Sequence, residues 1–169
     1  MKSHKIVKAC QKTLTCFGCR NDTTEGIGTR AYLTEDGYVV GIITTKECHQ
    51  GFPGIIHGGI ISTYFDEVLW HLHELVGPRI VIMTLNEAVN FRIPVPVGVE
   101  IRVVGEIEKT EGRKITAAGK LILPDGSVAA DCKILYLEIR KDPVQGLLIR
   151  ENTRIRKEFA EKDLEAIDF

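Results

Sequence analysis

The chain has 169 residues, of which 44% are hydrophobic and 27% are charged, a composition typical of one globular domain with a buried core. Its 22 basic and 23 acidic residues leave a net charge of −1, so no cationic surplus favours nucleic acid or a membrane surface as a partner. No apolar segment approaches the roughly 20 residues of a membrane-spanning helix, and the lysines near the amino terminus precede no signal-peptide core. We therefore expect a cytoplasmic protein.

Cysteines suggest one possible metal site, which their spacing argues against. An odd total of five cysteines without a secretion signal favours reduced thiols over a disulfide framework. Cys16 and Cys19, together with His4 and Cys10, would offer four zinc ligands. Zinc fingers usually bring two tight ligand pairs, however, and these four residues lack that pattern. We therefore expect free thiols, no metal and no cofactor.

The first predicted element is a β-hairpin, which follows a Cys-containing segment over residues 1–28. Thr29–Leu33 and Tyr38–Thr44 are rich in strand-forming residues. Asp36 and Gly37 between them are typical of a tight turn, because glycine tolerates the positive φ that such a turn requires.

One long helix is predicted for the middle of the chain, over Ile60–Val76. Its apolar side chains recur at helical spacing and form a wide buried face: Ile61, Tyr64, Phe65, Val68, Leu69, Leu72 and Val76. Counted from His57, such a helix would be about 30 Å long. Gly77 and Pro78 would end it.

Beyond this helix the pattern changes to strands, predicted over Arg79–Phe91, Glu100–Glu108, Lys114–Leu123 and Ser127–Ile139. Short links between them, including the Pro124-Asp125-Gly126 turn, predict an antiparallel meander. Val95-Pro96-Val97 marks a corner, because proline cannot donate to a central ladder. Residues 29–142 are thus expected to form one α+β domain, in which one long helix covers the apolar face of an antiparallel β-sheet.

A charged tail follows over residues 143–169. A ragged apolar stripe predicts that this tail is helical, after a cap at Asn152-Thr153; the stripe consists of Ile155, Phe159, Leu164 and Ile167.

Chemistry is expected where the loop 51–59 runs into the central helix. Gly58 and Gly59 let a ligand approach the backbone closely, or they simply fit a tight junction. Amides in the first turn have no partner within the helix, and the helix dipole is positive there. The Gly59 N–H is therefore the predicted donor of an oxyanion hole, and His57 is expected to fix the loop rather than to titrate.

Asp66 is the second candidate. It stands seven residues after Gly59, at the flank of the buried helix face, where an acid is costly unless it is paired or used. It is therefore either a functional carboxylate or the acceptor of a structural hydrogen bond. Glu67 falls further toward the polar side and is predicted to be an ordinary solvated residue.

The stretch His49–Trp70, HQGFPGIIHGGIISTYFDEVLW, resembles the signature of hotdog-fold acyl-CoA thioesterases of the phenylacetate-type (PaaI-like) superfamily. In their motif an aspartate follows nine residues after the histidine of an HGG, which is the spacing of His57 and Asp66. Further matches are Cys16-Phe-Gly-Cys19 with Asn21 and Gly26, Asn90 to Val95, Gly98, Asp125-Gly126 and Ala129. The similarity covers roughly residues 16–140.

This resemblance implies a hotdog fold, an antiparallel β-sheet wrapped around one long central helix. It also implies hydrolysis of an acyl-CoA or related thioester, in a homodimer or homotetramer with the active site at the subunit interface. It implies that Asp66 acts as general base or nucleophile and that the Gly59 amide polarises the thioester carbonyl, within the loop that His57 and Gly58 shape. The expected substrate contacts are Gln50, His49, Gly51, Phe52, Ser62, Trp70 and Arg92. Many relatives have an asparagine at the position of Gly51, so Gln50 or His49 would orient water or substrate here.

Two other functions fit the same fold. A hotdog hydratase or dehydratase needs an acid about fourteen residues after a loop histidine, and Thr63 occupies that position relative to His49. A non-catalytic acyl-CoA sensor needs only the pocket. Because both Gly59 and Asp66 are present, hydrolysis is the preferred prediction.

Overall fold

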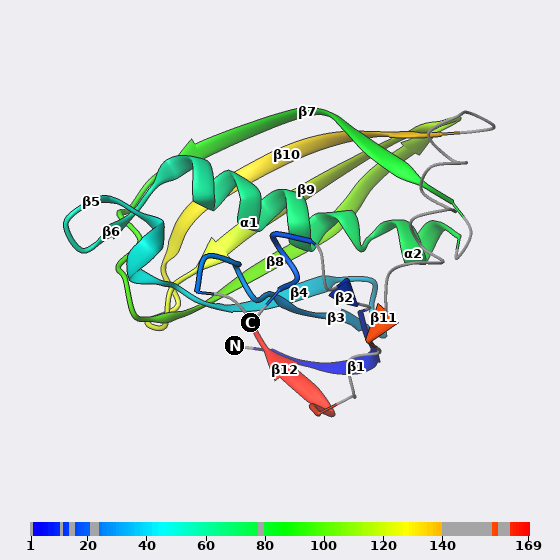
Figure 1. Cartoon of the computed structure of the whole chain (residues 1–169). Helices are drawn as coiled ribbons and strands as arrows, with labels where there is room; N and C mark the ends of the chain where they lie inside the picture. Colours follow the sequence, from blue (N-terminus) through cyan, green and yellow to red (C-terminus); the bar gives the residue numbers. More distant parts are fainter. Residues whose placement is uncertain are drawn as a thin grey trace.

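The computed structural model describes residues 2–10, 12–13, 16–20, 24–77, 80–139, 157–158 and 163–169. At its centre an eight-stranded antiparallel sheet, in the order β12-β1-β3-β4-β8-β9-β10-β7, curves around helix α1 (Figure 1). This is the α+β hotdog arrangement that the sequence predicts. Several residues named above lie outside the described part of the chain: Asn21, Pro78, Arg79, Asn152, Thr153, Ile155 and Phe159.

The elements have the following bounds. The large sheet consists of β1 Ser3–Ala9, β3 Arg30–Thr34, β4 Val39–Thr44, β7 Ile82–Phe91, β8 Glu100–Glu111, β9 Lys114–Ile122, β10 Val128–Glu138 and β12 Ala166–Asp168. Two small pairs join β2 Lys12–Thr13 to β11 Lys157–Glu158 and β5 Gln50–Phe52 to β6 Ile55–Ile56. The helical elements are the 3-10 helix η1 Glu47–His49, α1 Gly58–Trp70 and α2 His73–Val76. None of the described helices has the length and apolar character needed to cross a bilayer.

Both predicted hairpin turns are confirmed. Gly37, between β3 and β4, has a φ of 90°, and Gly126, between β9 and β10, has a φ of 86°. These values lie in the left-handed region that glycine adopts without the steric cost of a Cβ atom. Local backbone chemistry therefore determines both turns.

The central helix is shorter than the sequence predicts. α1 ends at Trp70 after 13 residues, about 20 Å, and a turn at His71 and Leu72 separates it from α2. In this turn the amides of His71 and Leu72 bond to carbonyls three residues back, which is the tighter 3-10 pattern. Apolar spacing does not reveal the change, because Leu69 at the end of α1 and Leu72 in the turn are both buried.

The strands after the helix pair differently from a simple meander. β8, β9 and β10 do pair in sequence order, but β7 pairs with β10 at the edge of the sheet and β8 pairs with β4. Figure 1 shows β7 arching over α1. The link from β7 to β8 contains the predicted corner at Val95-Pro96-Val97, which makes this crossing possible.

Glycines on three neighbouring strands make room for α1. A Cβ atom at Gly41 of β4 would collide with Val68, and one at Gly105 of β8 would lie 2.6 Å from Leu69 Cγ. Gly119 of β9 is paired with Gly105, and a Cβ atom there would lie 3.0 Å from Leu69 Cδ2. α1 therefore packs directly against the backbone of the sheet, and the main core fills this inner face.

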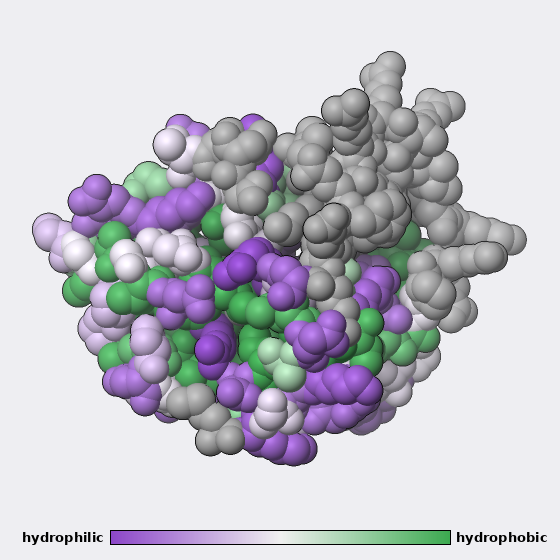
Figure 2. All heavy atoms as spheres, turned by 90° about the horizontal axis from the view of Figure 1, so that it is seen from below, coloured by the Kyte–Doolittle hydropathy of each residue, from purple (hydrophilic) through white to green (hydrophobic). Residues whose placement is uncertain are grey.

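Both ends of the chain join the large sheet, so the predicted division at residues 28 and 143 does not separate β1 and β12 from it. The described end of the tail is a strand, and the predicted helix is wrong there. Ile167 packs with Ile6 and Tyr32 in a second apolar cluster, on the outer face of the sheet. Figure 2 views the molecule from this side and shows hydrophobic residues interleaved with hydrophilic ones. Leu164 and Ile167 are too few positions to define a period.

Candidate active site

His57 fixes the loop at the start of α1. It is the N-cap residue, and its Nδ1 accepts a 2.9 Å hydrogen bond from the Gly59 N–H. The backbone N–H of His57 donates to the carbonyl of His49 at 2.9 Å. The imidazole thus does what a serine or aspartate side chain usually does at a helix start. The Gly59 amide, the predicted oxyanion donor, is therefore bonded to His57 in this structure.

A pocket of about 640 Å³ opens beside this loop. Its lining is mostly apolar and consists of Gly51, Phe52, Ile55, Ile56, His57, Gly58, Ile61, Phe91, Arg92, Ile93, Pro94 and Val95. A volume of this size suits a small organic ligand. The pocket therefore places apolar side chains next to the first backbone groups of α1.

Five of the predicted site residues line the pocket, namely Gly51, Phe52, His57, Gly58 and Arg92. Six others do not line it, namely Gln50, His49, Gly59, Ser62, Asp66 and Trp70. Arg92 Nε also forms an ion pair with Asp131 of β10. The pocket thus unites the loop residues with the end of β7 but leaves the predicted base elsewhere.

Three predicted substrate contacts make structural hydrogen bonds. Gln50 Oε1 accepts from the Gly54 N–H at 2.8 Å within the β5–β6 hairpin, and His49 Nε2 lies 2.7 Å from the carbonyl of Glu25. Trp70 Nε1 donates to the carbonyl of Ile82 at 3.2 Å, at the far end of α1. Substrate contact by these residues remains a prediction.

Asp66 lies on the part of α1 that faces the edge strand β7. Its Oδ1 accepts a 2.6 Å hydrogen bond from Thr84 Oγ1. Asp66 is half-buried and Thr84 is exposed, so the pair lies at the open edge of the sheet. Nothing in the sequence pattern singles out Thr84, because spacing within the chain carries no signal for a contact between a helix and a distant strand.

Glu87, also on β7, is a second carboxylate near Asp66. Burial raises the pKa of Glu87 to about 7, and the negative charge of Asp66 acts in the same direction. Glu87 Oε1 is buried without a hydrogen-bond partner among the described residues. Leu85, Glu87 and Val89 occupy every second position of the strand and so share one face. An acid between two apolar residues on that face is the sequence signal that would have pointed to Glu87.

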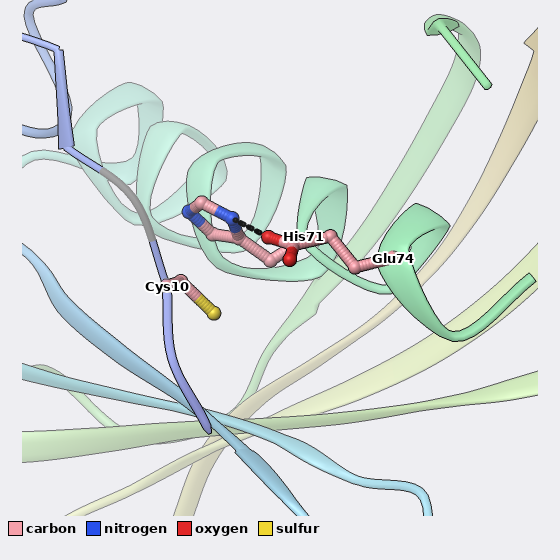
Figure 3. Close-up of side chains that lie close together, drawn as sticks. All are labelled: Cys10, His71 and Glu74. Carbon is pink, nitrogen blue, oxygen red and sulfur yellow. Dashed lines mark hydrogen bonds and ion pairs between the residues drawn. The ribbon is translucent and has the colours of Figure 1, made fainter. Parts of the chain in front are cut away.

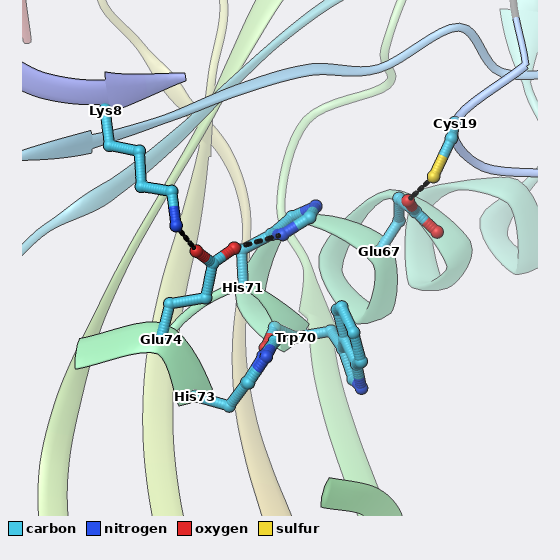
Figure 4. Close-up of polar contacts among 7 residues, drawn as sticks. All are labelled: Lys8, Cys19, Glu67, Trp70, His71, His73 and Glu74. Atoms are coloured by element: carbon cyan, nitrogen blue, oxygen red, sulfur yellow. Dashed lines mark hydrogen bonds and ion pairs between the residues drawn. The ribbon is translucent and has the colours of Figure 1, made fainter. Parts of the chain in front are cut away.

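Glu67 is not the solvated residue that the sequence predicts. Cys19 Sγ donates to its Oε1 at 2.8 Å (Figure 4). Cys16 Sγ lies 3.3 Å from its Oε2. Burial, followed by the charge of Cys16, raises the pKa of Glu67, and the hydrogen bond from Cys19 lowers the pKa of Cys16. The helical wheel shows only that Glu67 points away from the sheet, whereas the loop 16–20 covers that side of α1.

A further polar group ties β1 to the end of the helix (Figures 3 and 4). Glu74 accepts a hydrogen bond from Lys8 and lies 3.4 Å from His71 Nδ1, with Cys10 beside them. The bond to His71, and then that to Lys8, lowers the pKa of Glu74 to about 2, despite its burial. His4 instead pairs with Asp36, so the four residues weighed as zinc ligands do not meet.

Residues 53–130 match the family described as the thioesterase superfamily, and the fold is the hotdog. The matched stretch, 78 of the 169 residues, is therefore similar to this superfamily. Among curated proteins, the acyl-coenzyme A thioesterase THEM4 of Bos taurus is 34% identical over 99 residues, which make up 56% of this chain and 37% of that protein. The matched part is thus well under half the length of that curated relative.

Two solved structures agree with the fold. One thioesterase superfamily protein has 27% identity and a TM-score of 0.59, over 68% of this chain and 63% of that chain. The PaaI protein from the phenylacetic acid degradation operon of E. coli has 12% identity and a TM-score of 0.62, over 68% of this chain and 81% of that chain. The second likeness shows a shared fold.

Proposed function

We propose that this protein hydrolyses an acyl-CoA thioester to a free acid and coenzyme A. The observation that carries the proposal is the Asp66 carboxylate, which Thr84 holds on the central helix at the open edge of the sheet. The superfamily match and the curated relative named as an acyl-coenzyme A thioesterase support this substrate class.

Asp66 would supply the base of the reaction. Its Oδ1 is bonded to Thr84, so Oδ2 would accept a proton from water while the water oxygen attacks the thioester carbonyl carbon. Direct attack by the carboxylate, followed by hydrolysis of the resulting anhydride, is the alternative within the same site. In either case the carbon–sulfur bond of the thioester breaks and coenzyme A leaves as its thiolate.

Gly59 would supply the oxyanion donor. In the substrate complex the thioester oxygen would replace His57 Nδ1 as the acceptor of the Gly59 N–H. Gly58 lines the pocket beside it, and a Cβ atom at Gly58 would lie 3.4 Å from Phe91. The apolar pocket would hold a part of the substrate next to the thioester.

The two groups are too far apart on one helix to act on one carbonyl. Seven residues separate Gly59 from Asp66, which is about 10 Å along the helix axis. A base and an oxyanion donor must each lie within about 3 Å of the group they act on. We therefore propose a homodimer in which one chain supplies the Gly59 amide and the other supplies Asp66.

The edge strand β7 fits such an interface. Met83, Leu85 and Phe91 on this strand expose 47%, 53% and 56% of their surface. An exposed apolar edge strand pairs readily with another chain. Pairing of β7 with its copy would cover this surface and would bring a second chain to the Asp66–Thr84 pair.

Release of free thiol from a panel of acyl-CoA substrates, from acetyl to palmitoyl, tests the activity. We expect hydrolysis by the wild type and a loss of about a hundredfold or more in Asp66→Asn, because the general base contributes that much. Asp168→Asn, at an exposed position of β12, is the matched control and should retain full activity. Unchanged hydrolysis by Asp66→Asn would contradict the mechanism, and binding without turnover by the wild type would support a sensor instead.

Mixing two inactive variants tests the composite site. Gly59→Pro removes the donor in the first helical turn, where proline is tolerated. An equal mixture of Gly59→Pro and Asp66→Asn, refolded together, should regain about a quarter of wild-type activity, because half the dimers then contain one intact site. Circular dichroism checks that both variants fold. Mixed dimers without activity would show that both groups act from the same chain.

A further inference from the structure

We propose that Cys16, Cys19 and Glu67 bind a zinc ion, which ties the loop 16–20 to helix α1. The three side chains come from two segments about fifty residues apart and offer two sulfur ligands and one carboxylate oxygen, a donor set that suits zinc. This assignment departs from the free thiols expected from the sequence, and it uses a glutamate that the sequence places in solvent.

The geometry is close to that of a bound ion. Each pair of ligand atoms lies within 4.8 Å, and the distances from the carboxylate oxygens to Cys19 Sγ and Cys16 Sγ are 2.8 and 3.3 Å. Around a tetrahedral zinc ion, with sulfur at about 2.3 Å and oxygen at about 2.0 Å, the ligand sulfur and oxygen atoms lie about 3.5 Å apart. The Cys16 distance is already close to this value, and the Cys19 distance would lengthen by about 0.7 Å to make room for the ion.

The conformation of the Cys-x-x-Cys turn also favours zinc binding. The Cys19 N–H points at Cys16 Sγ at 3.4 Å, an arrangement that favours a thiolate. Gly18 between them lies against the glutamate, so that a Cβ atom at this position would collide with the Glu67 carboxylate. Cys16 is half-buried, so a water molecule can reach the ion and complete the tetrahedron.

The neighbouring group formed by Cys10, His71 and Glu74 is a weaker metal site (Figure 3). There the Lys8 ammonium already bonds to the Glu74 carboxylate, as Figure 4 shows, and it would compete with a cation. Burial strongly raises the pKa of the Cys10 thiol, which therefore resists the deprotonation that a zinc ligand requires. Glu67, in contrast, bonds to two thiols that can both become ligands.

A zinc ion here would act on the position of the helix. Glu67 follows Asp66 directly, so a metal tie at Glu67 would hold α1 against the amino-terminal segment, about 100° round the helix from the Asp66–Thr84 pair. The role proposed for the ion is structural, because its ligands and the pocket residues are different.

Metal content of the reduced protein tests the proposal. Wild-type protein is loaded with zinc under a reductant, dialysed and analysed by plasma mass spectrometry; we expect a single zinc ion per chain. Cobalt in place of zinc should give the intense sulfur-to-metal absorption of thiolate ligation. Cys16→Ser, Cys19→Ser and Glu67→Gln should each weaken metal binding at least about tenfold. Cys48→Ser is the matched control, because Cys48 is an exposed thiol that bonds to the carbonyl of Thr24.

Gly18→Ala is a sharper test, because it keeps all three ligands. Its Cβ atom should push the Glu67 carboxylate out of the site and lower zinc affinity about tenfold in competition with a chromogenic chelator. Circular dichroism verifies folding of each variant. Reduced wild type that retains no zinc, or equal zinc retention by a Cys16→Ser, Cys19→Ser double variant, would overturn the proposal. A Cys16–Cys19 disulfide in the purified protein, with no zinc bound after reduction, would also overturn the proposal.

Discussion

Thr84 Oγ1 on the edge strand β7 donates a 2.6 Å hydrogen bond to Asp66 Oδ1 on helix α1. The bond connects the helix that carries the proposed base to the strand that would face a second chain. The orientation of Asp66 therefore depends on β7, and any change to this strand should affect catalysis as well as assembly.

Removal of this hydroxyl should slow the reaction. Thr84→Val should lower kcat about tenfold to a hundredfold with little change in KM, because a hydrogen bond to a charged group contributes about 1.5–3 kcal/mol. Thr84→Ser keeps the hydroxyl and should retain most of the activity. Initial rates of thiol release measure both variants, and a wild-type kcat in Thr84→Val would show that the bond does not position the base.

Glu87 should make stability depend on pH. Its raised pKa means that the folded chain binds more protons than the unfolded chain between about pH 4.5 and about pH 7, so stability falls as pH rises through this range. Glu87→Gln removes this loss. The free energy of unfolding of this variant, relative to that of the wild type, should therefore be higher at about pH 8 than at about pH 5, by roughly 1 kcal/mol after allowance for solvent screening. The titratable groups around Glu87 are Asp66 on α1 and Cys132 and Tyr136 on β10.

Urea unfolding at the two pH values measures this difference. Glu106→Gln, at an exposed position of β8, is the control for removal of a glutamate from the sheet. The same difference between wild type and Glu87→Gln at both pH values would show that Glu87 titrates alike in the folded and unfolded chains.

The contact between Gly105 and Leu69 should be sensitive to a single methyl group. Gly105→Ala places a Cβ atom 2.6 Å from Leu69 Cγ and should destabilise the fold by about 1–3 kcal/mol through overpacking. Adding Leu69→Ala should make the two losses less than additive, because the smaller side chain removes the clash. Gly77→Ala is the control, since its φ of 177° is extended and its Cβ atom would lie 3.5 Å from Ile80. Thermal unfolding that is unchanged in Gly105→Ala would contradict this packing.

A charge on the edge strand should break the proposed dimer. Leu85→Lys places an ammonium group in the middle of β7 and should shift the protein to a monomer in sedimentation experiments, with loss of thioesterase activity. Val7→Lys on β1 is matched in exposure, since Val7 and Leu85 both expose 53% of their surface. If Leu85→Lys sediments like the wild type, the interface lies on another surface.

Much of the candidate site is local in origin and could be predicted. The helix start at His57, with Gly58 and Gly59, and the position of Asp66 seven residues later follow from helix geometry and from the resemblance to a known family. The placement of Thr84 and Glu87 near Asp66 could not be predicted, because β7 reaches α1 only by pairing with β10 at the edge of the sheet.

The sequence by itself determined the tight turns at Gly37 and Gly126, the apolar face of α1 and the extended runs of the sheet, because φ preference and side-chain periodicity are properties of neighbouring residues. Only the tertiary structure decided that Glu67 meets Cys16 and Cys19, that α1 ends at Trp70, and that both chain ends join the sheet. Those outcomes depend on which surfaces come together, and packing between distant segments leaves no repeating pattern along the chain.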